Sequence, residues 1–300
     1  MQQVAIVTDS SSCIAGHLAK AYGIEIVPYD LAFDDLVYRD GVDPVGAFYD
    51  LLRAAKRPPT TSAPSPGLYL EAFRAASTRA SSVLCITLPS NLSSSHNASQ
   101  QAVIMAEERL PGVQFRSVTA PAVAAGQGLI SLEAAELAAQ GASLNEVAAR
   151  VAALAPGVFF YAVLDSLEYL AKGGHVPAVA AWLGDRVGFK PVLTARHGKV
   201  ERLTQVRSKT RAIERMLLMM EDANPERAPI RAILMHADAP GEATRFSEKI
   251  RERFDCREVL ITEFTPVMGA HSGPGVVGIA YRVLDMDEFS ESEQVDASRK

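Results

Sequence analysis

Four hydroxyl-rich or glycine-rich turns are the parts of this 300-residue sequence best suited to bind a ligand. They are Asp9-Ser10-Ser11-Ser12, Thr60-Thr61-Ser62, Ser93-Ser94-Ser95 and His271-Ser272-Gly273-Pro274-Gly275. Each is placed where a strand passes into a loop or helix, and ligands of parallel α/β sheets gather at the carboxyl ends of strands. At Ser93-Ser94-Ser95 a hydroxyl group and the free N–H groups of a helix start point at the same place, which suits an anion.

A structural role competes with ligand binding at each turn. A serine at a helix start is also explained by helix capping alone, without a ligand. Lys172-Gly173-Gly174-His175 is likewise typical of an ordinary helix end. The threonine turn favours binding more strongly, because prolines on both sides stiffen the loop that holds its hydroxyl groups. Around His271, small residues let the backbone approach a ligand closely and hold one fixed turn.

Common enzyme and metal signatures are missing from the sequence. It contains neither a GxxxxGK[ST] phosphate loop nor a GxSxG elbow, and its six histidines show no paired metal spacing. Gly126-Gln127-Gly128 lacks the third glycine of a dinucleotide motif and lies inside a helical pattern. The isolated Cys13, Cys85 and Cys256 are interpreted as inert core residues of a reduced chain. We therefore predict no metal and no cofactor.

Composition indicates a folded, cytoplasmic protein. Apolar residues make up 48% and charged residues 22%, with a net charge of −5 and no basic tract, which argues against nucleic acid as a partner. One uncharged stretch, Ser117 to Leu132, is 16 residues long, too short and too polar to span a bilayer. The sequence enters a strand pattern at Val4 without a charged leader, so no signal peptide is expected.

The hydrophobic pattern predicts an α/β protein with two domains. Strands alternate with helices over residues 1–156, which predicts a three-layer α/β/α domain around a parallel sheet. Residues 157–285 include an alternating hairpin around His197-Gly198 and predict a two-layer α/β domain with a mixed sheet. Residues 286–300 are polar and are expected to fray. Two helices rich in small apolar residues, Pro121–Gln140 and Pro177–Val187, are candidate tunnel walls.

Taken in order, the turns resemble the DegV family. The matching segments are Thr8-Asp9-Ser10, Pro59-Thr60-Thr61-Ser62, Leu92-Ser93-Ser94-Ser95, Leu167-Glu168-Tyr169-Leu170 with Lys172-Gly173-Gly174, Lys190-Pro191-Val192-Leu193 and His271-Ser272-Gly273-Pro274-Gly275. Each segment alone is weak, but their order and spacing over residues 4–283 are specific.

The resemblance implies a protein that binds one long-chain fatty acid in an internal apolar tunnel and presents its carboxylate to a separate fatty acid kinase. The kinase makes an acyl phosphate for phospholipid synthesis, so this chain needs no catalytic residue and contacts membranes only transiently, for lipid exchange. In similar proteins the carboxylate is held by residues that match Thr61, Ser93 and His271 here. The secondary ligand-binding candidates are Ser10, Ser62, Ser94, Ser272 and His175.

Four positions depart from the family pattern. Ser94 replaces a Gly, Ser272 a Thr, Thr119 an Asp, and His175 the Arg of Lys-Gly-Gly-Arg. The last departure matters most, because a neutral imidazole has neither the charge nor the fork of a guanidinium. Two other functions stay open: a serine-dependent hydrolase or acyl transferase that uses Ser93 with His271, and a regulatory module that binds another small acid.

Overall fold

The computed structural model describes residues 2–34, 36–174, 179, 188–196 and 198–284.

The first sheet consists of four parallel strands. The strands, in spatial order, are β2 (Ile24–Val27), β1 (Gln2–Asp9), β6 (Ala80–Thr87) and β7 (Gln114–Thr119). The apolar runs of β1 and β6 are buried on both faces, as expected for a parallel sheet covered by helices on both sides.

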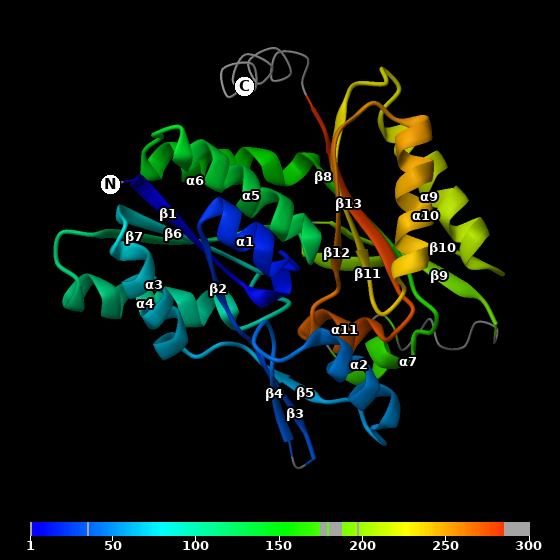
Figure 1. The fold of residues 1–300 in the computed structure, drawn as a ribbon, viewed down its shortest axis with the longest axis horizontal. Coiled ribbons are helices and arrows are strands. Elements are labelled where there is room, and N and C mark those ends of the chain that lie inside the picture. Colours follow the sequence, from blue (N-terminus) through cyan, green and yellow to red (C-terminus); the bar gives the residue numbers. More distant parts are fainter. Residues whose placement is uncertain (1, 35, 175–178, 180–187, 197, 285–300) are drawn as a thin grey trace.

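Helices cover both faces of this sheet (Figure 1). On one face lie α3 (Pro66–Ser77) and α4 (Ser95–Arg109), and on the other α1 (Gly16–Tyr22), α5 (Ala125–Ala139) and α6 (Leu144–Leu154). Val7 and Cys85 belong to the core under α3 and α4, whereas Ile6 and Leu84 belong to the core under α5. Alternating strand side chains thus feed two cores, and the predicted three-layer parallel arrangement is confirmed.

The second sheet is mixed, as predicted. Its strands, in spatial order, are β10 (Lys199–Val206), β9 (Lys190–Arg196), β8 (Val158–Val163), β13 (Val277–Val283), β11 (Ile230–His236) and β12 (Cys256–Glu263). Strands β11 and β12 pair in parallel, and the other neighbours are antiparallel. Helices α9 (Lys209–Ala223) and α10 (Pro240–Arg253) cover one face (Figure 1).

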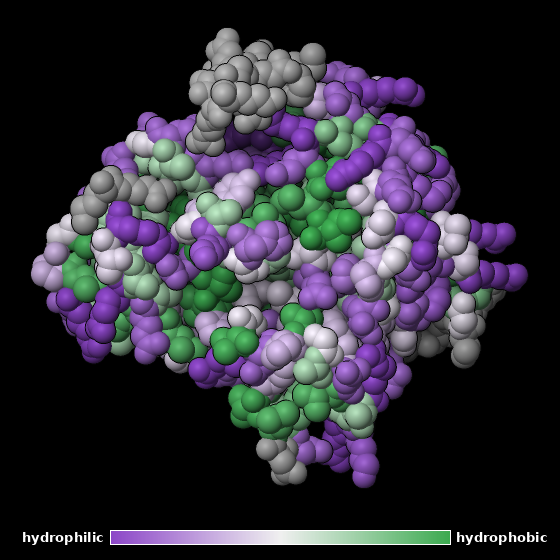
Figure 2. All heavy atoms as spheres, in the orientation of Figure 1, coloured by the Kyte–Doolittle hydropathy of each residue, from purple (hydrophilic) through white to green (hydrophobic). Residues whose placement is uncertain are grey.

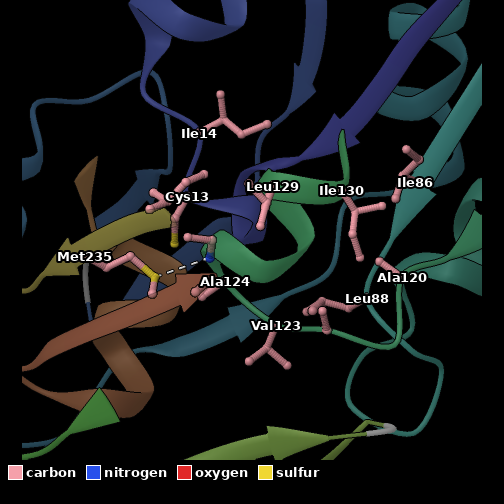
Figure 3. Close-up of a cluster of buried hydrophobic side chains, with 14 of the residues drawn as sticks. Cys13, Ile14, Ile86, Leu88, Ala120, Val123, Ala124, Leu129, Ile130 and Met235 are labelled. Carbon is pink, nitrogen blue, oxygen red and sulfur yellow. Dashed lines mark hydrogen bonds between the residues drawn. The ribbon is translucent and has the colours of Figure 1, made fainter. Parts of the chain in front are cut away.

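Helix α5 fills the space between the two sheets. It contacts β1 of the first sheet and β11 and β13 of the second. The Ala125 N–H donates to the Met235 sulfur at 3.3 Å, a contact drawn in Figure 3. Twelve of the fifteen residues of α5 are buried, which explains why its sequence is small and apolar on all sides. The division into domains at residues 156 and 157 stays a prediction, although the chain passes between the sheets there.

A third, small sheet was not predicted from the sequence. It contains β4 (Leu36–Arg39), β3 (Asp30–Phe33) and β5 (Thr60–Ser62), all antiparallel. The threonine turn is therefore a strand and not a free loop, which is a correction to the sequence interpretation. Strands of three or four residues are too short to show a clear alternation. The β3–β4 hairpin projects from the body of the protein (Figure 1).

Two helix starts differ from the sequence prediction. Helix α4 begins at Ser95 and α5 at Ala125, later than the predicted Ser93 and Pro121. The delay in α5 has a local cause, because Ala124 has a φ of 49° and a ψ of −135° and cannot continue a helix. Asp43 does not cap the next helix, α2 (Val45–Ala54), because its carboxylate accepts the N–H of Arg39 instead. In the described residues no helix is both long and apolar enough to cross a membrane.

Candidate functional site

Thr61 and His271 meet although they are far apart in the sequence. Thr61 lies in β5, and His271 lies near the end of α11 (Pro266–Ser272). The Thr61 Oγ1 is 3.1 Å from the His271 Nε2, which is hydrogen-bonding distance. The turn predicted around His271 thus begins with a short helix. Because both side chains are half-buried, a ligand that reaches them loses part of its hydration.

Glycines allow the backbone of α7 (Glu168–Gly173) to pack against the His271 ring. A Cβ atom on Gly173 would lie 2.5 Å from the His271 Nδ1, too close for any larger residue. Conversely, a Cβ atom on Gly273 would collide with the Tyr169 ring. Gly174 has a φ of 71°, in the left-handed region that favours glycine. Gly173 therefore lets α7 pack directly against the His271 ring, and Gly273 lets the end of α11 pack against Tyr169 of α7. These contacts hold the imidazole in place.

Ser93 lies at the start of α4 beside an unpredicted residue, Tyr29. The Ser93 Oγ is 2.7 Å from the Tyr29 hydroxyl and accepts the N–H of Ser95 at 3.1 Å. The Ser95 hydroxyl is buried and has no hydrogen-bond partner among the described residues. Two serine hydroxyls and the positive end of a fifteen-residue helix thus face the Tyr29 hydroxyl, which suits an anion.

Tyr29 connects Ser93 with the Thr61–His271 pair. It directly precedes β3, where Leu31 pairs with Thr61. Burial raises the pKa of the Tyr29 hydroxyl, which therefore stays protonated and able to donate. The only sequence signal for this residue is its place just after β2, since ligands gather at the carboxyl ends of parallel strands.

The secondary candidates have different surroundings. The buried Ser10 hydroxyl accepts the Tyr29 N–H at 3.1 Å, and the Ser272 hydroxyl donates to the Met268 carbonyl at 2.9 Å. Both hydroxyls thus support the backbone near the site. Ser62 and Ser94 are exposed, and His175 lies outside the described residues. Most of the candidate wall Pro177–Val187 also lies outside them, apart from the buried Val179.

A second polar cluster lies behind β1 and is fully buried. The Gln127 Nε2 donates to the Thr8 Oγ1 at 2.9 Å and to the Asp9 Oδ1 at 3.3 Å, and the Tyr69 hydroxyl donates to the Asp9 Oδ2 at 3.1 Å. Burial raises the pKa of Asp9 against the effect of these bonds. A Cβ on Gly128 would lie 2.5 Å from the Ser12 carbonyl oxygen. Gly126-Gln127-Gly128 therefore packs α5 against the turn after β1.

The arrangement does not favour a nucleophilic serine. Ser93 contacts Tyr29 and a backbone N–H, and among the described residues it makes no hydrogen bond to His271. Cys13 and Cys85 are buried, and burial raises the pKa of both thiols, that of Cys13 to about 12. In the part of the chain that the structure describes, no three His, Cys, Asp or Glu side chains gather as a metal would require. The site consists of hydroxyl groups and an imidazole around a half-buried point.

Comparison with known proteins places the chain in a family. A DegV domain-containing protein of Streptomyces coelicolor is 31% identical, over 93% of this chain and 98% of its own length. A DegV family protein of Thermus thermophilus, whose structure is described as fatty acid binding, superposes with a TM-score of 0.85 at 28% identity, covering 94% of this chain and 100% of that one.

Another solved structure shares the fold at lower identity. A stearic-acid-binding protein of Eubacterium ventriosum superposes with a TM-score of 0.84 at 22% identity, covering 96% of this chain and all of that one. The family model of the DegV proteins, described as uncharacterised, matches residues 3–283. The predicted resemblance is therefore confirmed over nearly the whole chain, and the protein belongs to the DegV family.

Proposed function

We propose that this protein binds one long-chain fatty acid and holds its carboxylate between Thr61, Ser93 and His271. The observation that carries the proposal is the 3.1 Å contact between Thr61 and His271, two residues selected from sequence and 210 positions apart. The likeness to the fatty-acid-binding relative of Thermus thermophilus, 28% identical, supports it.

The donors at the site match the needs of a buried carboxylate. An anion that leaves water without partners is costly, whereas hydrogen bonds to a charged acceptor are strong. The hydroxyls of Thr61, Ser93 and Tyr29 and the imidazole of His271 offer donors from four separate segments of the chain. The first turn of α4 adds free backbone N–H groups. This set can satisfy both oxygens of a carboxylate without a cation.

The acyl chain supplies most of the affinity. A sixteen-carbon acid has roughly 14 methylenes, and at about 0.8 kcal/mol each their burial is worth on the order of 11 kcal/mol before ordering costs. We place the chain in the apolar core between the carboxyl ends of β6 and β7 and the inner face of β8 and β9. Leu88, Val123, Ala162, Leu193 and Ala195 belong to this one core.

Small side chains give this core room to adapt. Ala120 and Ala124 lie near Leu88 and Val123 where the loops after β6 and β7 meet α5 (Figure 3). Two surface hollows of about 470 and 490 Å³ lie instead at the start of β12, near Phe254. Since α11 follows the other end of β12, neither hollow is at the proposed head-group site.

The bound carboxylate is presented to a separate fatty acid kinase, which phosphorylates it. The phosphorylated oxygen belongs to the ligand, so this chain holds and orients the acid and contributes no nucleophile. The β3–β4 hairpin beside Thr61 carries the exposed Leu36 and Val37, 47% and 62% exposed (Figure 2). An apolar surface next to the head group suits contact with a protein partner.

Native mass spectrometry and competition binding test the lipid part of the proposal. Delipidated protein is mixed with saturated acids of 10 to about 18 carbons, and each added methylene should strengthen binding until the space is filled. Ser93→Ala should weaken acid binding, whereas Ser94→Ala, a change at the exposed neighbour, should not. A chain with no acyl adduct at any length would contradict the proposal.

A reconstituted reaction tests the kinase part. The loaded protein is incubated with a bacterial fatty acid kinase and ATP, and acyl phosphate is trapped as a hydroxamate. Acyl phosphate should form only when both proteins are present, and less should form with Ser93→Ala. The hydrolase alternative predicts the opposite pattern: release of product from an activated ester by the chain alone, lost in Ser93→Ala.

A further inference from the structure

Helix α11, which carries His271, is capped by a residue of the turn that follows β4. The residue before the helix, Thr265, makes no side-chain capping bond to it and donates to the Ser10 carbonyl at 2.8 Å. The Asp40 Oδ2 instead accepts the N–H of Val267, in the first turn of α11, at 3.0 Å. Asp40 is fully buried. A carboxylate 227 residues away thus satisfies an N–H group that a helix start leaves unpaired.

Asp40 also belongs to the backbone ladder that ends at Tyr29. The Asp40 N–H donates to the Tyr29 carbonyl at 2.9 Å, one step beyond the paired Asp30 and Arg39. The small sheet and the residues that flank its strands therefore contact each of the three candidate head-group residues or the helix that carries it. Tyr29 reaches Ser93, Thr61 reaches His271, and Asp40 reaches the helix on which His271 lies.

We propose that Asp40 is a positioning residue, which fixes α11 so that the His271 imidazole stays in register with Thr61 for the carboxylate. This inference rests on the proposed binding of a fatty acid, and it adds a residue that touches neither the acid nor His271. The carboxylate needs only to accept the Val267 N–H. An amide oxygen of the same shape therefore serves nearly as well, whereas a methyl group does not.

Asp43 offers a matched control on the same hairpin. Its Oδ2 accepts the Arg39 N–H at 2.7 Å, and its carbonyl accepts the Tyr38 hydroxyl. The hydrogen bonds that the structure gives Asp43 thus stay within the turn after β4 and do not reach α11. Asp43→Ala removes a carboxylate three residues from Asp40 and leaves the bond to Val267 in place.

The test compares hexadecanoic acid with hexadecanol, which share a tail and differ in the head group. Asp40→Ala should weaken binding of the acid about tenfold and leave binding of the alcohol within about twofold. The acid-to-alcohol ratio of affinities should thus fall at least about fivefold, which is about 1 kcal/mol. Asp40→Asn and Asp43→Ala should keep the wild-type ratio. Equal losses for acid and alcohol would overturn the inference and leave Asp40 as a purely structural residue.

Two further measurements separate this inference from the proposed function. Val267→Pro deletes the donor and keeps the carboxylate, so it should lower the acid-to-alcohol ratio of affinities as Asp40→Ala does. It therefore tests the same hydrogen bond if Asp40→Ala folds poorly. The ring proton signals of His271, assigned by their loss in His271→Gln, should shift in Asp40→Ala and not in Asp43→Ala. A wild-type chain that binds no acid would contradict the proposed function. Unshifted His271 signals in Asp40→Ala would contradict only the positioning role of Asp40.

Discussion

The Thr61 Oγ1 lies 3.1 Å from the His271 Nε2, and this contact joins the small sheet to α11. Neither residue is held by its own local sequence alone. Thr61 is placed by its pairing with Leu31, and His271 by the packing of α11 against Gly173. The head-group site is therefore a property of tertiary structure, and changes at its supports should act on it as strongly as changes at its donors.

Thr61→Val tests the donor itself. Valine keeps the shape and the β-strand preference of threonine and removes its hydroxyl. Because a hydrogen bond to a charged group is worth about 1.5–3 kcal/mol, we expect fatty acid affinity to fall about tenfold to hundredfold. Displacement of a fluorescent fatty acid measures the loss. Ser62→Ala, at the exposed next residue, is the control, and an equal loss there would mean that the strand and not the hydroxyl matters.

Gly173→Ala tests the support behind the imidazole. The new methyl group would lie 2.5 Å from the His271 Nδ1, so the ring must move away from Thr61. We expect fatty acid affinity to fall at least tenfold with a modest loss of stability. Gly174→Ala meets no atom within 4 Å and strains only a left-handed backbone, at about 1 kcal/mol. It should lower stability and keep affinity. The reverse order of affinities would contradict this account.

Arg231→Met tests the ion pairs that tie α5 to the second sheet. The side chain of Arg231 is 8% exposed, and it bonds Glu136 of α5 at 2.6 Å and Glu258 of β12 at 2.7 Å. Removing the cation leaves two partly exposed carboxylates without their partner, so we expect a loss of about 1–3 kcal/mol in the free energy of unfolding. Urea unfolding measures it. Arg39→Met breaks an exposed pair with Asp30 and should cost much less, because water screens that pair.

Asp40 should make stability depend on pH. Burial raises its pKa from 3.8 to about 7, partly offset by the Val267 N–H. The folded protein therefore holds a proton that the unfolded chain has released between about pH 4 and pH 7. The stabilisation from this proton is complete below about pH 4 and is lost as the pH rises through about 7.

The comparison with Asp40→Asn isolates this effect. The amide does not titrate, so the variant should gain stability relative to the wild type, by about 4 kcal/mol at most, as the pH rises from about 4 to about 8. Urea unfolding at several pH values gives the difference, in which the other titrating groups largely cancel. A difference that stays constant over this range would show that Asp40 keeps an ordinary pKa in the folded protein.

The sequence predicted the two large sheets and three site residues for different physical reasons. Long apolar strands such as β1 and amphipathic helices such as α6 carry their own periodicity, so their existence can be read locally. Thr61 and His271 were selected as candidates because prolines flank the one and a glycine-rich turn follows the other, and their role in binding stays a prediction. Tyr29 and Asp40 were missed, because their partners Ser93 and Val267 lie 64 and 227 residues away and no local pattern records such contacts.

The small sheet shows the same limit. Its strands have three or four residues, and their pairing brings Leu31 beside both Tyr38 and Thr61. Each strand gains its stability from its neighbours, so a window of a few residues has too little information to reveal it.

Because α5 packs against both large sheets, the two halves of the protein cannot separate by a rigid-body hinge motion. Such a motion would strip the buried surface of α5 on one side and break the bonds from Arg231 to Glu136. If the protein binds a fatty acid as we propose, the acid enters and leaves through a local opening and not through separation of the two sheets. The β3–β4 hairpin and the short helices α7 and α11 contribute only a few buried side chains each to this core, among them Leu31, Leu170 and Ala270. Hydrogen exchange should therefore find their amides opening before those of α5.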